Sequence, residues 1–335
     1  MSDYQNKKIL IIGGTGTIGQ YLLEELLLHS PEVIRIFSRD EYKQFELSQK
    51  YREFKNIRYL IGDIRDEKRL IRAMEDIDYV FHLAAMKHVP ACEYNPLEAV
   101  KTNIIGTQNV IQAALENNVK RVLFTSSDKA ISPTNVYGST KLTAERLIAA
   151  ADYQKGSKKT IFSSVRFGNV MGSRGSVIPL FKKQILNHRE ITVTDGKMLR
   201  YMMTPSQAIQ LILKANKRAK GGEVFVLKMP VLKIGDLAEV IIEEVRKQYS
   251  IREEINIKEI GIRPGEKNYE ELMTDDEVLI AIESEDMYTI LPHHEQGAYQ
   301  KQWKQAQKVE KPYPKEEDAI SKNKISKWFQ EENIL

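Results

Sequence analysis

The sequence predicts an α/β fold: a Rossmann-type doubly wound parallel sheet, followed by a smaller α/β C-terminal substrate-binding lobe. Two observations support this prediction. Short runs rich in Ile, Val and Phe alternate with longer amphipathic segments through the first half of the chain, which is the order of parallel strands and crossover helices. The first run also leads into a turn with Gly13, Gly16 and Gly19, where a helical pattern begins.

The strands of the first half are predicted from apolar runs that suit a sheet covered on both faces. These runs comprise residues 7–14, 33–40, 57–64, 78–85 and 120–127. Residues 160–170 are expected to extend the same sheet as a sixth strand. Between the strands, helical periodicity is found at residues 18–30, 66–76 and 98–118.

From about Gly172 the pattern changes, and a second lobe is expected. Helices are predicted over residues 177–188, 206–219 and 233–249, with a strand over 223–229. We therefore divide the chain into a cofactor-binding domain (1–171), a mainly substrate-binding lobe (172–290) and a peripheral tail (291–335). Some elements of the second lobe are expected to return to the first domain.

Composition excludes several classes of protein. The 335 residues carry 50 basic and 46 acidic side chains, a formal net charge of +4 without any long basic block, which argues against a nucleic-acid partner. Cys92 is the only cysteine, so an intrachain disulfide framework is excluded. No apolar run approaches the roughly 20 residues of a membrane span, and the N-terminus runs directly into a strand pattern without the apolar core of a signal peptide. A cytoplasmic protein is expected.

The three-glycine turn predicts a dinucleotide site. A turn without side chains lets the backbone approach a pyrophosphate, and the following helix offers free N–H donors at its N-terminus. A merely structural glycine turn is the alternative, but the position after the first strand favours the cofactor. The expected cofactor contacts near this turn and the strand ends are Gly13, Thr15, Gly16, Thr17, Ile18, Gly19, Ser38, Arg39, Asp63, Ile64 and Ala84.

The end of the second strand bears on the choice between NADP and NAD. An acidic residue about 20 positions after the glycines binds a ribose 2′-hydroxyl, whereas an arginine accommodates a 2′-phosphate. The sequence has both, Arg39 and Asp40, and Ser38 adds a hydroxyl. We favour NADP, with NAD as the alternative. Asp63 is placed to meet the adenine amino group or to cap the next helix.

Tyr137 and Lys141 are predicted to lie on one face of a helix that covers residues 136–150, because they are four residues apart. An unperturbed tyrosine titrates near 10. A neighbouring lysine ammonium and an oxidised nicotinamide would lower the pKa of Tyr137 and make it a usable base. A solvated helix face is the default reading of such a pair. Behind a glycine-rich cradle, however, the pair indicates redox chemistry.

The sequence resembles the extended short-chain dehydrogenase/reductases that act on nucleotide sugars. More closely, it resembles the inverting UDP-N-acetylglucosamine 4,6-dehydratases of surface-sugar pathways. The resemblance spans roughly residues 8 to 270 and rests on the segments IFSRDE, LAAMKHVPACEYNP, TNIIGTQNV, SSDKAISPTNVYGSTK, RFGNVMGSRGSVIPLF and GIRPGEK.

This resemblance implies UDP-GlcNAc as the substrate, tightly held NADP that is regenerated in each turnover, and a homo-oligomer, either a dimer or a hexamer. It also implies that cofactor or substrate contacts come from Lys87, Asn103, Asn169, Arg200, Arg263 and Glu266. At the start of the helix over 177–188, Ser176 and Val177 are further expected substrate contacts. The six histidines lack zinc-like spacing, so no metal is expected.

Asp128 and Lys129, just before the Tyr–Lys pair, have no task in a simple dehydrogenase. A 4,6-dehydration does need them. Oxidation at carbon 4 acidifies the proton on carbon 5, and elimination then requires a base for that proton and an acid for the departing 6-hydroxyl. We expect Tyr137 to take the 4-hydroxyl proton and Ser127 to bind that hydroxyl. We expect a neutral Lys129 with a depressed pKa as the base, and a protonated Asp128 with a raised pKa as the acid.

Three other interpretations stay open at this point. Asp128–Lys129 could be an ion pair that caps the strand–loop junction. A UDP-sugar 4-epimerase shares the fold and the Tyr–Lys chemistry, but would leave Asp128–Lys129 without a role. A non-catalytic nucleotide-binding module would have kept the glycine cradle alone, and the presence of both Tyr137 and Lys141 argues against it.

Overall fold

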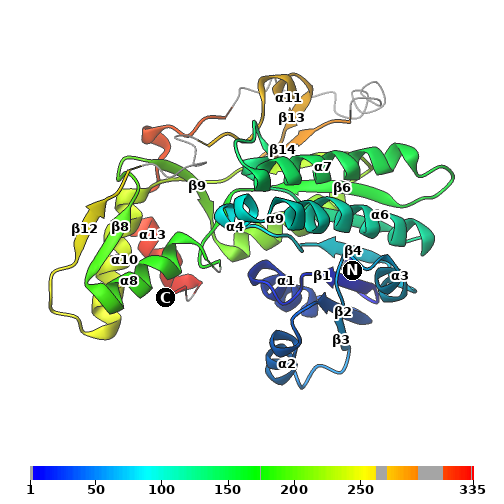
Figure 1. Cartoon of the computed structure of the whole chain (residues 1–335), viewed down its shortest axis with the longest axis horizontal. Coiled ribbons are helices and arrows are strands. Elements are labelled where there is room, and N and C mark those ends of the chain that lie inside the picture. Colours follow the sequence, from blue (N-terminus) through cyan, green and yellow to red (C-terminus); the bar gives the residue numbers. More distant parts are fainter. Residues whose placement is uncertain (1–2, 174, 262–269, 293–311, 333) are drawn as a thin grey trace.

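The computed structural model describes residues 3–173, 175–261, 270–292, 312–332 and 334–335. Its centre is a nine-stranded sheet in the order β13-β14-β10-β6-β5-β4-β1-β2-β3 (Figure 1). The seven strands from β10 to β3 are parallel, and β14 and β13 add an antiparallel edge. The predicted doubly wound parallel sheet is confirmed.

The strands of this sheet lie close to the predicted apolar runs. Their bounds are β1 Lys8–Ile12, β2 Val33–Ser38, β3 Ile57–Ile61, β4 Tyr79–His82, β5 Arg121–Thr125, β6 Ile161–Arg166, β10 Val224–Leu227, β13 Ala281–Glu283 and β14 Met287–Ile290. The central strands are buried along almost their whole length, because helices cover both faces of the sheet.

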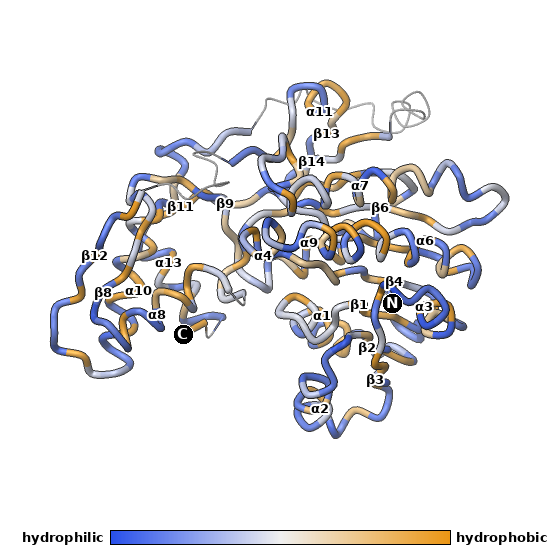
Figure 2. The backbone as a smooth tube through the Cα atoms, viewed as in Figure 1, coloured by the Kyte–Doolittle hydropathy of each residue, from blue (hydrophilic) through white to orange (hydrophobic). Residues whose placement is uncertain are grey.

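Helices pack on both faces of the sheet and form two apolar cores. One face is covered by α1 (Thr17–Leu27), α2 (Glu41–Lys50) and α9 (Pro205–Arg218). The other is covered by α3 (Glu67–Met74), α6 (Gly106–Glu116) and α7 (Val136–Gln154). Figure 2 shows the apolar residues of these segments alternating with polar ones along each helix. The helix predicted over 98–118 is divided into α5 (Pro96–Ala99), a π-helical turn η1 (Val100–Ile105) and α6.

The C-terminal lobe is built on two small sheets, β11-β9-β7 and β12-β8. Its core is formed by helices α8, α10 and α13. The bounds of its elements are β7 Asn169–Val170, α8 Val177–His188, β8 Glu190–Val193, β9 Leu199–Met203, β11 Val231–Lys233, α10 Ile234–Tyr249, β12 Asn256–Glu259 and α13 Lys322–Glu331. The shorter helices α4 (Val89–Tyr94) and α11 (Asp275–Ile280) lie at the edges of the larger lobe.

Two sequence predictions differ from the structure. The run 160–170 is not one strand: β6 ends at Arg166, and after the turn at Phe167–Gly168 the chain enters β7 in a different sheet. The predicted peripheral tail contains α13, whose Ile325, Trp328 and Phe329 are buried against the second lobe. These three side chains lie at i, i+3 and i+4, so one helix face buries all of them.

A buried ion-pair network ties three elements together at the end of β6. Arg166 is fully buried and donates hydrogen bonds to Glu145 on α7 (2.6 Å from Nη2) and Glu277 on α11 (2.8 Å from Nη1). It also donates to the carbonyl of Leu272. Burial disfavours the Glu277 carboxylate, but Arg166 outweighs this and holds the pKa of Glu277 below its ordinary value.

Among the described residues, no helix is both long enough and apolar enough to span a membrane.

Candidate active site

The glycine turn after β1 forms a close-packed cradle at the start of α1. Gly13 has a φ of +83°, and a Cβ there would lie 2.8 Å from the backbone N of Ala84. At Gly19 a Cβ would lie 2.6 Å from the Cα of Gly14, so the helix approaches the turn as only glycine permits. The N-cap of α1, Gly16, has no capping side chain. A helix N-terminus without a side-chain cap is a typical place for a phosphate to bind.

A cavity of about 800 Å³ lies over this cradle. Most of the predicted cofactor contacts line it: Gly13, Thr15, Gly16, Thr17, Ile18, Gly19, Ser38, Arg39, Ile64, Ala84 and Lys87. Asp63, Asn103, Tyr137 and Lys141 are not in its lining. Asp63 Oδ2 instead accepts hydrogen bonds from Nε and Nη2 of Arg65, at 3.0 and 2.7 Å, and it lies 3.6 Å from Nη1 of Arg39.

Asp40 and Arg39 have different tasks at the end of β2. The Asp40 carboxylate caps α2, accepting from the N–H of Lys43 at 3.0 Å, and it forms an ion pair with the Lys43 ammonium group. The Arg39 side chain is 58% exposed and faces the cavity. The hydroxyl of Ser38 accepts a hydrogen bond from Gln44 at 3.0 Å, so its own hydrogen can point elsewhere.

Lys141 and Tyr137 are both buried on α7, as their spacing predicts. Lys141 Nζ donates to the carbonyl of Thr125 at 2.7 Å and lies over the ring of Phe124. Burial lowers the pKa of Lys141 to about 7, although the negative charge of Glu145 opposes the shift.

Tyr137 is buried, and burial raises its pKa above its ordinary value. A hydrogen bond with Ser127 and the charge of Lys129 act in the opposite direction. The lysine with the strongest effect on Tyr137 is thus Lys129 and not Lys141. The predicted lowering of this pKa requires an oxidised nicotinamide as well as a lysine, and it stays a prediction for the protein with its cofactor.

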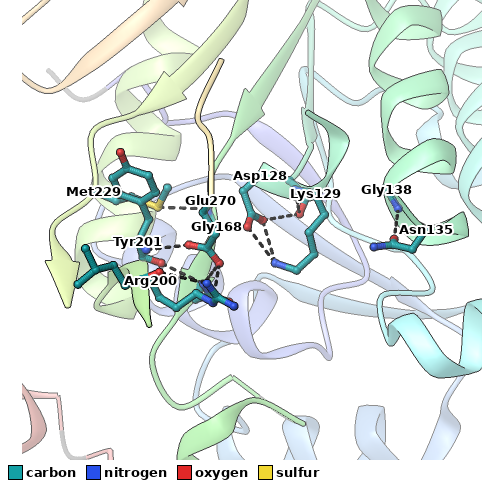
Figure 3. Close-up of polar contacts among 12 residues, drawn as sticks. Asp128, Lys129, Asn135, Gly138, Gly168, Arg200, Tyr201, Met229 and Glu270 are labelled. Atoms are coloured by element: carbon teal, nitrogen blue, oxygen red, sulfur yellow. Dashed lines mark hydrogen bonds and ion pairs between the residues drawn. The ribbon is translucent and has the colours of Figure 1, made fainter. Parts of the chain in front are cut away.

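Ser127, Asp128 and Lys129 form a tight cluster at the carboxyl end of β5. Figure 3 shows the contact between Asp128 and Lys129. The Asp128 carboxylate accepts from the Ser127 hydroxyl at 2.8 Å and from Lys129 Nζ at 2.9 and 3.1 Å. Only 3% of the Asp128 side chain is exposed, against 36% for Lys129, whose amino group borders the second cavity.

The protonation state predicted for Lys129 was wrong. Burial disfavours its ammonium form, but the negative charges of Asp128 and Glu270 outweigh that effect and hold the pKa of Lys129 above its ordinary value. Asp128 accepts three hydrogen bonds and therefore lies in the arrangement of a carboxylate. The cluster is an ion pair at the edge of a cavity.

That second cavity, of about 410 Å³, lies between the two lobes and shares Lys87, His88 and Ser173 with the first. It brings together the predicted substrate contacts Lys87, Asn169, Ser176, Val177 and Arg200 with Asp128 and Lys129. The hydroxyl of Ser176 is buried and has no hydrogen-bond partner among the described residues. Arg263 and Glu266 lie outside the described residues.

Asn103 lies in the π-helical turn η1 and lines neither cavity. Its side chain accepts from the N–H of Met86 at 2.8 Å, and donates to the carbonyl of Met86 and to the Thr140 hydroxyl. It therefore fixes the loop that carries Lys87 to helix α7. No cluster of His, Cys, Asp and Glu that could hold a metal ion occurs among the described residues.

Sequence reasoning missed Glu270, a carboxylate in the wall of the second cavity. It is buried, and it contacts residues on β7 and β9. The available signal was the pair Glu270–Glu271 directly before two apolar residues, Leu272 and Met273, which are buried. Charged residues so close to a buried run are drawn into the interior with it.

Three features define an extended short-chain dehydrogenase/reductase. They are a parallel sheet with a glycine cradle, a buried Tyr–Lys pair on the helix after β5, and a second lobe that lines a cavity together with the end of β5. The chain belongs to the polysaccharide biosynthesis protein family, whose profile matches residues 9–292.

Similar proteins include dehydratases and epimerases. The chain is 45% identical to a Campylobacter jejuni UDP-N-acetylglucosamine 4,6-dehydratase (inverting), covering 86% of this chain and 84% of that one. It is 39% identical to a UDP-glucose 4-epimerase of Rickettsia rickettsii, covering 86% and 83%. The crystal structure of Pen from Bacillus thuringiensis superimposes with a TM-score of 0.92, at 55% identity and over 100% of both chains. These relatives confirm the family resemblance.

Proposed function

We propose that this protein is a 5-inverting UDP-N-acetylglucosamine 4,6-dehydratase that uses NADP. The observation that carries the proposal is the Asp128–Lys129 ion pair at the edge of the substrate cavity, next to Tyr137. The C. jejuni relative carries the same activity in its name. An oxidoreductase without an elimination step would leave this buried pair unused.

The roles of Asp128 and Lys129 follow from their ion pair. The glycine cradle would hold NADP, which would supply a hydride acceptor for carbon 4 and a hydride donor for carbon 6. Tyr137 takes the proton of the 4-hydroxyl, which Ser127 orients, because the positive charge of an oxidised nicotinamide would favour its phenolate. Asp128 removes the proton from carbon 5, and Lys129, as an ammonium ion, protonates the departing 6-hydroxyl. A proton from solvent then adds to the opposite face of carbon 5 and completes the product. This assignment reverses the acid and base roles expected from the sequence, because Lys129 lies between negative charges.

A UDP-sugar 4-epimerase is the second candidate, since the R. rickettsii relative bears that name. Mass spectrometry after incubation with UDP-GlcNAc separates the two. The dehydratase product is lighter than the substrate by one water, whereas an epimer has the same mass. A product of unchanged mass would reject the proposed function.

The preference for NADP is tested at Arg39. Asp40, which also lines the cofactor cavity, is engaged as a helix cap and by the Lys43 ammonium group, while Arg39 brings a positive charge to the same cavity. Arg39→Ala should weaken NADP binding about 10- to 100-fold, the value of a lost charge-assisted hydrogen bond, and leave NAD binding unchanged. Calorimetric titration of cofactor-free enzyme measures both. Arg52→Ala, an exposed arginine paired only with its neighbour Glu53 in the described contacts, serves as the control. An equal loss for both cofactors contradicts the assignment.

We further propose that the enzyme is a cytoplasmic homo-oligomer, as the family resemblance implies. Tyr94 on α4 and Leu97 on the adjoining helix α5 are large apolar residues, and they expose 88% and 61% of their surface. Apolar exposure of this kind is typical of a surface that another subunit covers.

A further inference from the structure

Glu270 connects three parts of the substrate cavity. One carboxylate oxygen accepts from the backbone N–H of Tyr201 at 2.8 Å. The other accepts from the Asn169 side-chain amide at 3.0 Å and lies 3.4 Å from Arg200 Nε. Asn169 also donates to the carbonyl of Tyr201 at 3.1 Å, which closes a small network. Only 8% of Glu270 is exposed, so these contacts are held in a largely water-free setting.

The charge of Glu270 also acts on the ion pair at the end of β5. Figure 3 shows Glu270 between Arg200 and the Asp128–Lys129 pair. Burial and the charge of Asp128 raise the pKa of Glu270, against the cations Lys129 and Arg200. The titratable groups around this cluster are Lys87 and His88 after β4, Asp128 and Lys129 after β5, Tyr137 on α7, Arg200 on β9, and Glu270 and Glu271 before α11.

Two cations and two carboxylates therefore share the inner end of the cavity. Glu270 lies against Nε of Arg200, and its negative charge acts on Lys129 together with that of Asp128. One carboxylate thus holds Arg200 in the cavity wall and helps to keep Lys129 charged beside Asp128.

Resting on the proposed dehydratase activity, we infer that Glu270 is a positioning residue for the elimination step. Its carboxylate holds Arg200 and Asn169 in the cavity wall and favours the ammonium form of Lys129, the partner of Asp128. It neither gains nor loses a proton. In the step that it supports, the carbon-5 proton passes to Asp128 and the electrons of that bond form the carbon 5–carbon 6 double bond. The carbon 6–oxygen bond breaks, and a proton from Lys129 completes water.

The test separates oxidation at carbon 4 from elimination. In Glu270→Gln the absorbance of reduced nicotinamide should rise after UDP-GlcNAc is added and then persist, because oxidation proceeds while elimination slows about 100-fold. Glu270→Asp keeps the charge at a shorter reach, so its elimination should fall less, about tenfold, again with oxidation intact. Wild-type enzyme should show only a transient signal.

Glu223→Gln is the matched control. Glu223 is also buried and accepts from two backbone N–H groups, those of Lys220 and Gly221, but it does not line the cavity. It should behave as wild type.

Two results overturn the inference: Glu270→Gln eliminates water at the wild-type rate, or oxidation and elimination fall together. If melting curves show that Glu270→Gln does not fold, Glu270→Asp supports the same comparison, and an equal fall of both steps there overturns the inference. A wild-type enzyme that releases no water would reject the proposed function instead.

Discussion

Lys129→Gln is expected to reduce dehydration of UDP-GlcNAc about 10³-fold, within the usual contribution of a general acid. The glutamine amide can still donate to Asp128, so the buried carboxylate keeps a hydrogen-bond partner, but the side chain has no proton to give to the leaving hydroxyl. Oxidation at carbon 4 depends on Tyr137 and should slow much less, through the loss of the Lys129 charge that lowers the pKa of Tyr137. Reduced nicotinamide should therefore accumulate, while cofactor binding measured by calorimetry stays at the wild-type value.

Lys155→Gln is the control for this variant. Lys155 pairs with Asp152 at 2.7 Å and is also partly buried, but it lies at the end of α7 remote from both cavities. Its glutamine variant should dehydrate the sugar at the wild-type rate. Unimpaired dehydration by Lys129→Gln would refute the role assigned to the ion pair.

Arg166→Met should destabilise the fold by about 3–5 kcal/mol, the cost of breaking a buried ion pair from one side. The change leaves Glu145 and Glu277 buried without their common cation. In the variant, burial should raise the pKa of Glu277 above its unfolded value, so protonation of this carboxyl favours the folded state. The difference in unfolding free energy between wild type and variant should therefore become smaller as the pH falls from about 8 to about 5. Urea unfolding at several pH values measures it.

Arg146→Met is the comparison for this second variant. Arg146 also lies within 3.6 Å of Glu277, but its side chain is 52% exposed. Exposed pairs contribute about 0–1 kcal/mol, so this variant should stay close to wild type. If Arg146→Met and Arg166→Met lowered the free energy of unfolding equally, burial would not be the reason that the network stabilises the fold.

The sheet and the cradle were predictable because their signals are local. The strands from β1 to β6 are short apolar runs, and the glycine turn lies at a fixed position after β1. Where β6 ends was not predictable from apolarity. β7 has only two residues, Asn169 and Val170, and only Phe167 and Gly168 separate it from β6, although it belongs to another sheet. In the tail, the signal of α13 was present in the spacing of Ile325, Trp328 and Phe329 but is short.

The electrostatic part of the site could not be predicted from neighbours in the sequence. Asp128 and Lys129 are adjacent, and their pairing is evident. The charge state of Lys129, however, also depends on Glu270, which reaches the cavity from a distant segment through contacts with Asn169 and Tyr201. Such contacts are set by the packing of the two lobes. The predicted neutral lysine was wrong for that reason.

The central claim is that the ion pair turns a redox site into an elimination site. The most direct measurement is NMR of the product formed from UDP-GlcNAc in deuterated water. The account predicts a 4-ketone, a methyl group at carbon 6 and deuterium at an inverted carbon 5. A product that keeps its 6-hydroxymethyl group and differs from the substrate only in the configuration at carbon 4 would contradict it.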